Sequence, residues 1–191
     1  KQFSGLDLGK RGIRMDLWVR ERSSDDKPVI RLYDIEPNIY HDHLPKRSRF
    51  YQAKADAKEL PTGSKFEELP ELVMIWILPY DPFGKNRMVY TIRNQCEEDT
   101  TIPYDDGARK IFLYTKGREG NPSQELRDML KYIEETTTDN IANQNIGTLH
   151  RLVEKVKHRK EVGINYMKSW ELEKMWKQEG IEEGLAQGLE Q

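Results

Sequence analysis

Seven consecutive apolar residues, 72–78 (LVMIWIL), constrain the fold of this chain more than any other feature. The run is too short to cross a bilayer as a helix, which takes about 20 apolar residues. It has the length of a strand, and a strand that is apolar at every position is covered on both faces of its sheet. We therefore expect residues 71–79 to form a central strand of an α/β protein.

A β-hairpin is predicted upstream of this strand. Residues 12–20 alternate between apolar and polar side chains, with Ile13, Met15, Leu17 and Val19 on one face. Residues 29–36 are rich in β-forming residues, and the polar segment 21–28 supplies the turn. Pro37 cannot donate a hydrogen bond to a neighbouring strand, so the second strand should end there.

A helix is predicted over residues 44–60, with Pro45 at its first turn and Pro61-Thr62-Gly63 stopping it. Its apolar residues recur at three- and four-residue steps and predict the buried face: Phe50, Ala53, Ala57 and Leu60. Short strands are expected at 87–94 and 110–114, with a turn at Asp105-Asp106-Gly107 between them.

The character of the chain changes after residue 120. An amphipathic helix is predicted over 123–137, with Leu126, Met129, Leu130 and Ile133 on one face, and a charged helical segment over 149–178. The last residues, 179–191, repeat glycine and glutamate. We predict three parts: a core at 1–120, a helical extension at 121–178 and a low-complexity tail at 179–191.

Composition excludes some classes of function. The 31 basic and 33 acidic residues nearly balance, so a nucleic-acid surface would have to be a local patch. The single cysteine, Cys96, excludes a disulfide framework and a zinc site built on Cys pairs. We expect a cytoplasmic protein that does not associate with membranes.

Two acids on the predicted hairpin could share a metal ion. Asp16 lies in the middle of the first strand and Glu36 at the end of the second. Cross-strand neighbours lie roughly 5 Å apart, and two carboxylates with a backbone carbonyl are hard ligands that suit Mg²⁺ or Mn²⁺. Asp34 is a rival ligand on the same face as Glu36. The alternative is that these acids are solvated, or paired with Arg14 and Arg31.

A basic segment follows the hairpin. Basic side chains at Lys46, Arg47, Arg49 and Lys54 could contact phosphates, and Tyr51 and Gln52 lie among them. The alternative is an ordinary charged face of a surface helix.

Several segments together resemble one family. RGIRMDLWVRE, YDIEPN, LPKRSRFYQAK, ELVMIWIL, DPFGKNRMVYTIRNQCEE, DDGARKIFLYTKG and EVGINYMKSWELE, in this order, resemble the PD-(D/E)XK nuclease family transposases, relatives of the recombination-promoting nucleases. The resemblance implies a restriction-endonuclease-like mixed sheet flanked by helices, in an αβββαβ arrangement. It implies metal-dependent cleavage of DNA, in recombination, transposition or defence.

The resemblance also assigns residues. Asp16 matches the first motif acid and Glu36 the acid of the (D/E)-x-K element, with the carbonyl of Pro37 completing a Mg²⁺ or Mn²⁺ site. Asn38 stands where that element has lysine, and it would hold the water or the phosphate. The DNA-binding set is Lys46, Arg47, Arg49, Tyr51 and Gln52. We expect the N-terminal helix of the family to be missing or truncated in this sequence.

Two functions are thus expected from the sequence. The first is a Mg²⁺-dependent DNA endonuclease, for which a homodimer is left open. The second is a DNA-binding or protein-interaction scaffold whose site has decayed, with the charged helices from Leu149 onward as its working surface. Asn38 in place of lysine favours the scaffold, whereas the two intact acids favour the enzyme.

Overall fold

The computed structural model describes residues 3–5, 13–35 and 43–157. The chain divides into two compact units, residues 1–123 and 124–191. The elements of the first unit are β1 (Phe3–Gly5), β2 (Ile13–Met15), β3 (Leu17–Arg22), β4 (Pro28–Ile35), α1 (Leu44–Glu59), a 3₁₀ turn (Phe66–Glu68), β5 (Glu71–Leu78), β6 (Val89–Ile92) and β7 (Ala108–Tyr114).

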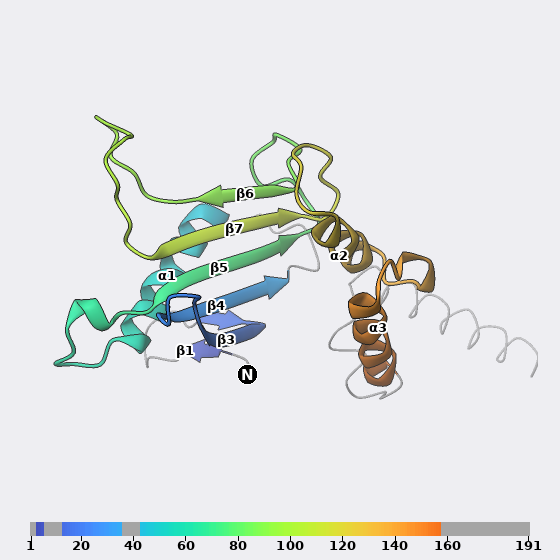
Figure 1. Ribbon diagram of the computed structural model, residues 1–191, viewed down its shortest axis with the longest axis horizontal. Coiled ribbons are helices and arrows are strands. Elements are labelled where there is room, and N and C mark those ends of the chain that lie inside the picture. The colour runs from blue at the N-terminus through green and yellow to red at the C-terminus, as the bar shows by residue number, and fades with distance from the viewer. Residues whose placement is uncertain (1–2, 6–12, 36–42, 158–191) are drawn as a thin grey trace, which may run out of the picture. The chain divides into compact units, whose positions relative to one another are not determined.

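The first unit is built on a five-stranded mixed sheet with the strand order β3-β4-β5-β7-β6 (Figure 1). β3 and β4 form an antiparallel hairpin, β5 runs parallel to both β4 and β7, and β6 is antiparallel to β7. α1 makes the crossover between the parallel strands β4 and β5, as such a connection requires. The predicted α/β class and its mixed sheet are confirmed.

β5 is the central strand that the apolar run predicts. Its residues 72–78 are all buried, none of them more than 8% exposed. The side chains of β5 that alternate toward α1 form the core with residues of β4, β7 and the helix. This core comprises Met15, Ile30, Leu32, Leu44, Ala55, Leu72, Met74, Trp76, Leu78, Tyr90 and Phe112.

The predicted helix forms, but the predicted buried face of α1 is wrong. The buried residues of α1 are Leu44, Ser48 and Ala55, whereas Phe50 is 36% exposed. The Ser48 hydroxyl donates to the carbonyl of Pro45 at 3.0 Å, so its polar atom is satisfied within the helix. Because serine and alanine are small, they let α1 lie close to the sheet, which the spacing of apolar residues alone does not reveal.

The first predicted strand, 12–20, is broken at Asp16. The segment before the break, β2, pairs with β1 in a separate two-stranded sheet, and the segment after it, β3, pairs with β4. Met15 is fully buried whereas Leu17 is 44% exposed, and Trp18 packs against the core. The prediction that Met15 and Leu17 share a face is therefore wrong, because the chain changes partner strand between them.

The second unit contains α2 (Gln124–Glu134), a 3₁₀ turn (Thr138–Asn140) and α3 (Gln144–Lys157). Leu130, which lies on the predicted apolar face of α2, is buried, and so is Tyr132, which the prediction omits. α3 begins before the predicted residue 149, with the Ile146 N–H donating to the Asn143 side chain at 3.0 Å. The rest of the predicted charged helix and the tail lie outside the described residues.

Within the parts of the chain that the structure describes, no helix is long and apolar enough to span a bilayer.

Candidate functional site

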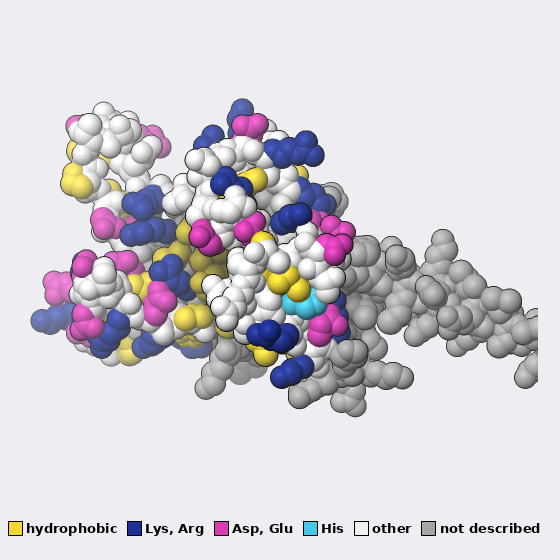
Figure 2. All heavy atoms as spheres, turned by 45° about the vertical axis from the view of Figure 1, so that its right-hand side comes forward, with side chains coloured by type: hydrophobic (Ala, Val, Ile, Leu, Met, Phe, Trp, Pro, Cys, Tyr) yellow, Lys and Arg dark blue, Asp and Glu magenta, His cyan; other side chains and the backbone are white. Residues whose placement is uncertain are grey.

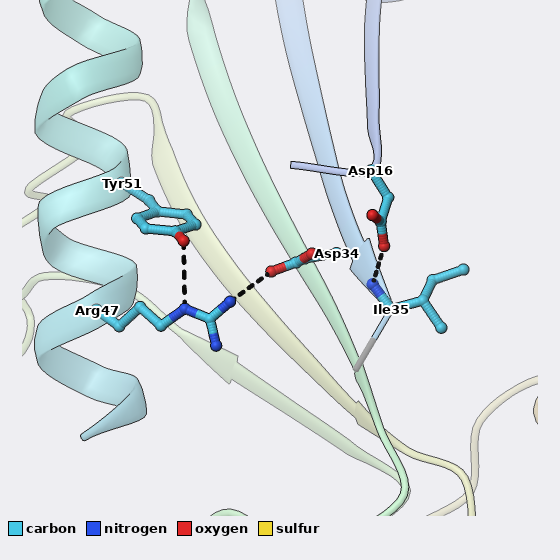
Figure 3. A network of polar contacts seen from close by, with 5 residues as sticks. All are labelled: Asp16, Asp34, Ile35, Arg47 and Tyr51. Atoms are coloured by element: carbon cyan, nitrogen blue, oxygen red, sulfur yellow. Dashed lines mark hydrogen bonds and ion pairs between the residues drawn. The ribbon is translucent and has the colours of Figure 1, made fainter. Parts of the chain in front are cut away.

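Asp16 lies at the bend between β2 and β3, and its side chain is exposed. Its carboxylate oxygen Oδ2 accepts a hydrogen bond of 2.9 Å from the backbone N–H of Ile35 (Figure 3). Ile35 is the last residue of β4. The break in the strand thus places the Asp16 carboxylate at the end of β4.

Glu36, Pro37 and Asn38 lie outside the described residues. Among residues 3–5, 13–35 and 43–157, no group of three or more His, Cys, Asp or Glu side chains could hold a metal ion. Asp16 offers the kind of ligand that Mg²⁺ prefers, an exposed carboxylate oxygen. Of the predicted ligand set Asp16, Glu36 and Pro37, Asp16 is therefore the one that the structure describes.

Asp34, the predicted rival ligand, is buried beneath α1. Its register partner on β5 is Trp76, whose side chain belongs to the core beneath the helix. The Asp34 carboxylate forms an ion pair with the guanidinium of Arg47 at 3.1 Å, and the two side chains are only 9% and 16% exposed. Arg31, one of the partners predicted for the acids, instead pairs with Glu21 at 2.5 Å.

Arg47 is enclosed between this carboxylate and two aromatic rings. Its guanidinium carbon lies 4.9 Å from the ring centre of Trp76 and 5.3 Å from that of Tyr51, distances at which a cation is attracted to a ring. Its Nε donates to the Tyr51 hydroxyl at 3.4 Å. Figure 3 shows the side chain reaching from α1 toward Asp34, while the Asp16 carboxylate points to Ile35.

Trp76 provides the buried ring against which Arg47 and Tyr51 pack. Its side chain is fully buried, and the rings of Trp76 and Tyr51 lie 5.6 Å apart. In the described part of the chain, its indole Nε1 is the one buried side-chain nitrogen or oxygen without a hydrogen-bond partner. A buried donor left unpaired costs about 1–3 kcal/mol. Contact with the guanidinium offsets part of that cost.

The predicted DNA-binding residues divide between two faces of α1, because successive residues of a helix point about 100° apart. Lys46 and Arg49 are exposed, whereas Arg47, Tyr51 and Gln52 are partly buried. Gln52 hydrogen-bonds to the carboxylate of Asp56 one turn further along. Two of the five therefore face solvent, as a phosphate contact must.

Asp56, on the same helix, has a raised pKa. Burial is the main cause, and the carboxylate of Asp106 adds to it, while the hydrogen bond from Gln52 and the charge of Lys110 oppose it. Burial in turn lowers the pKa of Lys110 on β7. The charges of Asp56 on α1 and Lys110 on β7 thus influence each other.

Charges of both signs are interspersed on the face of the molecule that Figure 2 displays, in keeping with the nearly balanced composition.

The network of Asp34, Arg47 and Trp76 is what the sequence-based prediction missed. One signal could have found it: Ile30, Leu32 and Asp34 alternate on one face of a strand, so the aspartate continues a buried row. An aspartate in that position needs a cation, and a helix that follows directly can supply one.

Comparison of the chain with protein-family models, with curated proteins and with solved structures finds no match.

Proposed function

We propose that this chain is a Mg²⁺-dependent DNA endonuclease of the PD-(D/E)XK type, which hydrolyses phosphodiester bonds. One observation carries the proposal: the Asp16 carboxylate docks on the backbone N–H of Ile35, directly before Glu36. Asp16 thereby contacts the last residue of β4, and Glu36 is the next residue in the sequence, 20 positions after Asp16.

The order of the elements also supports the proposal. In the five-stranded sheet β3 and β4 are followed by the helix α1 and then by β5. This agrees with the order of the last four elements expected in an αβββαβ arrangement. The first acid stands at the bend, and the second is expected directly after β4, before α1 crosses over.

The residues have separate roles in this proposal. Asp16, Glu36 and the carbonyl of Pro37 would hold Mg²⁺ or Mn²⁺ with oxygen ligands. When bound, such an ion lowers the pKa of a water molecule and stabilises charge on the scissile phosphate. Asn38 orients the water through its amide, which can both donate and accept. Lys46 and Arg49, on the exposed face of α1, contact phosphates.

The test is cleavage of supercoiled plasmid in Mg²⁺, Mn²⁺ or EDTA. The parent protein should nick the plasmid only with a metal present, and Asp16→Asn and Glu36→Gln should abolish nicking. Mn²⁺ should also raise the melting temperature of the parent, since an ion at a hundredfold excess over its Kd stabilises by about 2.7 kcal/mol. Asp16→Asn should erase that rise.

Asp25→Asn is the matched control, because Asp25 is exposed in the turn at the other end of the same hairpin. It should cleave as the parent does. Nicking that persists in EDTA or in Asp16→Asn would identify a contaminating nuclease and contradict the proposal.

A second candidate function is a DNA-binding scaffold without catalysis, which the asparagine at position 38 favours. Under this alternative the protein retards plasmid in a gel but leaves it supercoiled under every metal condition. Glu36→Ala separates the two candidates, because it should remove cleavage while metal-free DNA binding persists.

A further inference from the structure

Arg47 differs from its neighbours on α1 in what surrounds it. Lys46 and Arg49 are exposed, whereas the Arg47 side chain is enclosed by a carboxylate, a phenol and an indole. A guanidinium held on three sides in this way has little freedom left to meet a DNA phosphate. Its charge is also matched by Asp34, so it offers little net attraction to a second anion.

We propose that Arg47 is a positioning residue for Asp16, on which it acts through Asp34 and the end of β4. The proposal rests on the nuclease function proposed above and adds to it a residue that orients a metal ligand without contacting the metal itself. It removes Arg47 from the set of DNA contacts.

The connection runs through one peptide unit. The N–H that binds Asp16 belongs to the peptide bond between Asp34 and Ile35, and this unit is planar. Asp34 is fixed on its side-chain end by Arg47 at 3.1 Å. The ion pair thus anchors the end of β4, which carries this N–H, to α1.

Charge gives a second reason for the pairing. Asp16 and Asp34 each adjoin a residue of the last register pair of the hairpin, Leu17 with Tyr33, so two carboxylates stand at this end of it. Two carboxylates at neighbouring positions repel each other. Arg47 matches the charge of Asp34 from the helix side, and the site is left with the charge of the motif acids, which a divalent cation can neutralise.

Arg47→Met and Arg49→Met form a matched pair for the test, since the two arginines lie two residues apart on one helix and face opposite environments. Two quantities are measured on the full chain: the Kd for Mn²⁺ by calorimetry, and the salt dependence of DNA binding in EDTA. Arg47→Met should weaken Mn²⁺ binding about 10–100-fold, the usual effect of removing a group that orients a ligand, and leave the salt slope unchanged. Arg49→Met should keep Mn²⁺ affinity and reduce the salt slope by about 0.9.

Two more variants keep the test decisive if Arg47→Met folds poorly. Asp34→Asn should reproduce the loss of Mn²⁺ affinity, because it removes the other partner of the same ion pair. Arg47→Lys should retain part of the affinity, because an ammonium keeps the charge but not the planar fork. A loss in Asp34→Asn that Arg47→Lys and Arg47→Met do not share would make Asp34 a direct metal ligand and overturn the proposal.

The other outcomes are equally clear. Mn²⁺ affinity within threefold of the parent in folded Arg47→Met overturns the inference while the nuclease function stands. A salt slope that drops in Arg47→Met as it does in Arg49→Met makes Arg47 a phosphate contact and overturns it as well. A parent protein that neither binds Mn²⁺ nor cleaves DNA ends both proposals together.

Discussion

Neutralising one partner of the Asp34–Arg47 ion pair should destabilise the first unit far more than its exposed ion pairs do. The perturbations are Asp34→Asn, Arg47→Met and the double variant, which form a double-mutant cycle. In each single variant one charge remains under α1 without its partner. In the double variant both charges are gone, so part of the cost of either single change should be recovered.

The structure sets the size of the effect. At 3.1 Å and an effective dielectric constant of about 20, the attraction between two unit charges is about 5 kcal/mol. Removing both charges from water offsets much of this attraction. We expect Arg47→Met to cost about 3–5 kcal/mol, the usual cost of leaving a buried charge unpaired. The double variant should cost about 2–3 kcal/mol less than the sum of the single variants.

Urea unfolding followed by tryptophan fluorescence measures these free energies in the unit that contains the pair. In a Trp170→Phe, Trp176→Phe background, the remaining tryptophans are Trp18 and Trp76, both in the first unit. With a slope of about 1–3 kcal/mol per M urea, a loss of 3 kcal/mol moves the midpoint by roughly 1–3 M.

The Glu21–Arg31 pair on the same hairpin is the matched control. Its side chains are 39% and 36% exposed, and its coupling energy should stay below about 1 kcal/mol. If the Asp34–Arg47 cycle gave a coupling energy as small as that of the control pair, the buried ion pair would not form in solution. The inference about Arg47 would then lose its structural basis.

Two further predictions concern the site and its helix. Asn38→Ala should lower the single-turnover cleavage rate, by up to about a hundred- to a thousandfold for one lost stabilising group, while the Mn²⁺ affinity stays nearly constant. Asn38→Lys should cleave at least as fast as the parent, because lysine adds a positive charge near the scissile phosphate. An unchanged rate in Asn38→Ala would assign the water to another group. Asp56→Asn should raise the melting temperature at neutral pH, because burial raises the folded-state pKa of Asp56; the resulting loss of stability begins as the pH rises above the ordinary pKa of 3.8 and is complete above the folded-state pKa. That gain should disappear near about pH 3, where the carboxyl is protonated in both the folded and the unfolded state, and a gain that persists there would contradict the assignment.

The sequence predicts those parts of the fold in which one pattern dominates. The apolar run at 72–78 identifies the central strand because only a strand covered on both faces excludes polar side chains at every position. The helix at 44–60 is identified by Pro45 and by the stop signal after it. These elements depend on local composition, which a single sequence shows directly.

What the sequence does not predict depends on partners that are distant in the chain. The alternation of residues 12–20 continues through Asp16 without interruption, so nothing local reveals that the chain there exchanges β1 for β4 as its partner. In the sequence Arg47 looks like one more basic residue of the segment, and only the structure shows that it contacts Trp76 and Asp34. The small residues Ser48 and Ala55, and not the larger apolar ones, face the sheet, because the close approach of helix and strand rewards small volume.

The position of Trp76 has a consequence for the order of folding. Asp16, Asp34 and Arg47 all come from the hairpin and the helix that follows it, segments whose contacts are short in sequence and form early. Trp76 lies on β5, which reaches β4 only after the chain has closed a loop across the whole of α1. A nascent chain that has made the hairpin and the helix therefore contains Asp16, Asp34 and Arg47, but Arg47 gains its contact with Trp76 only when β5 joins the sheet.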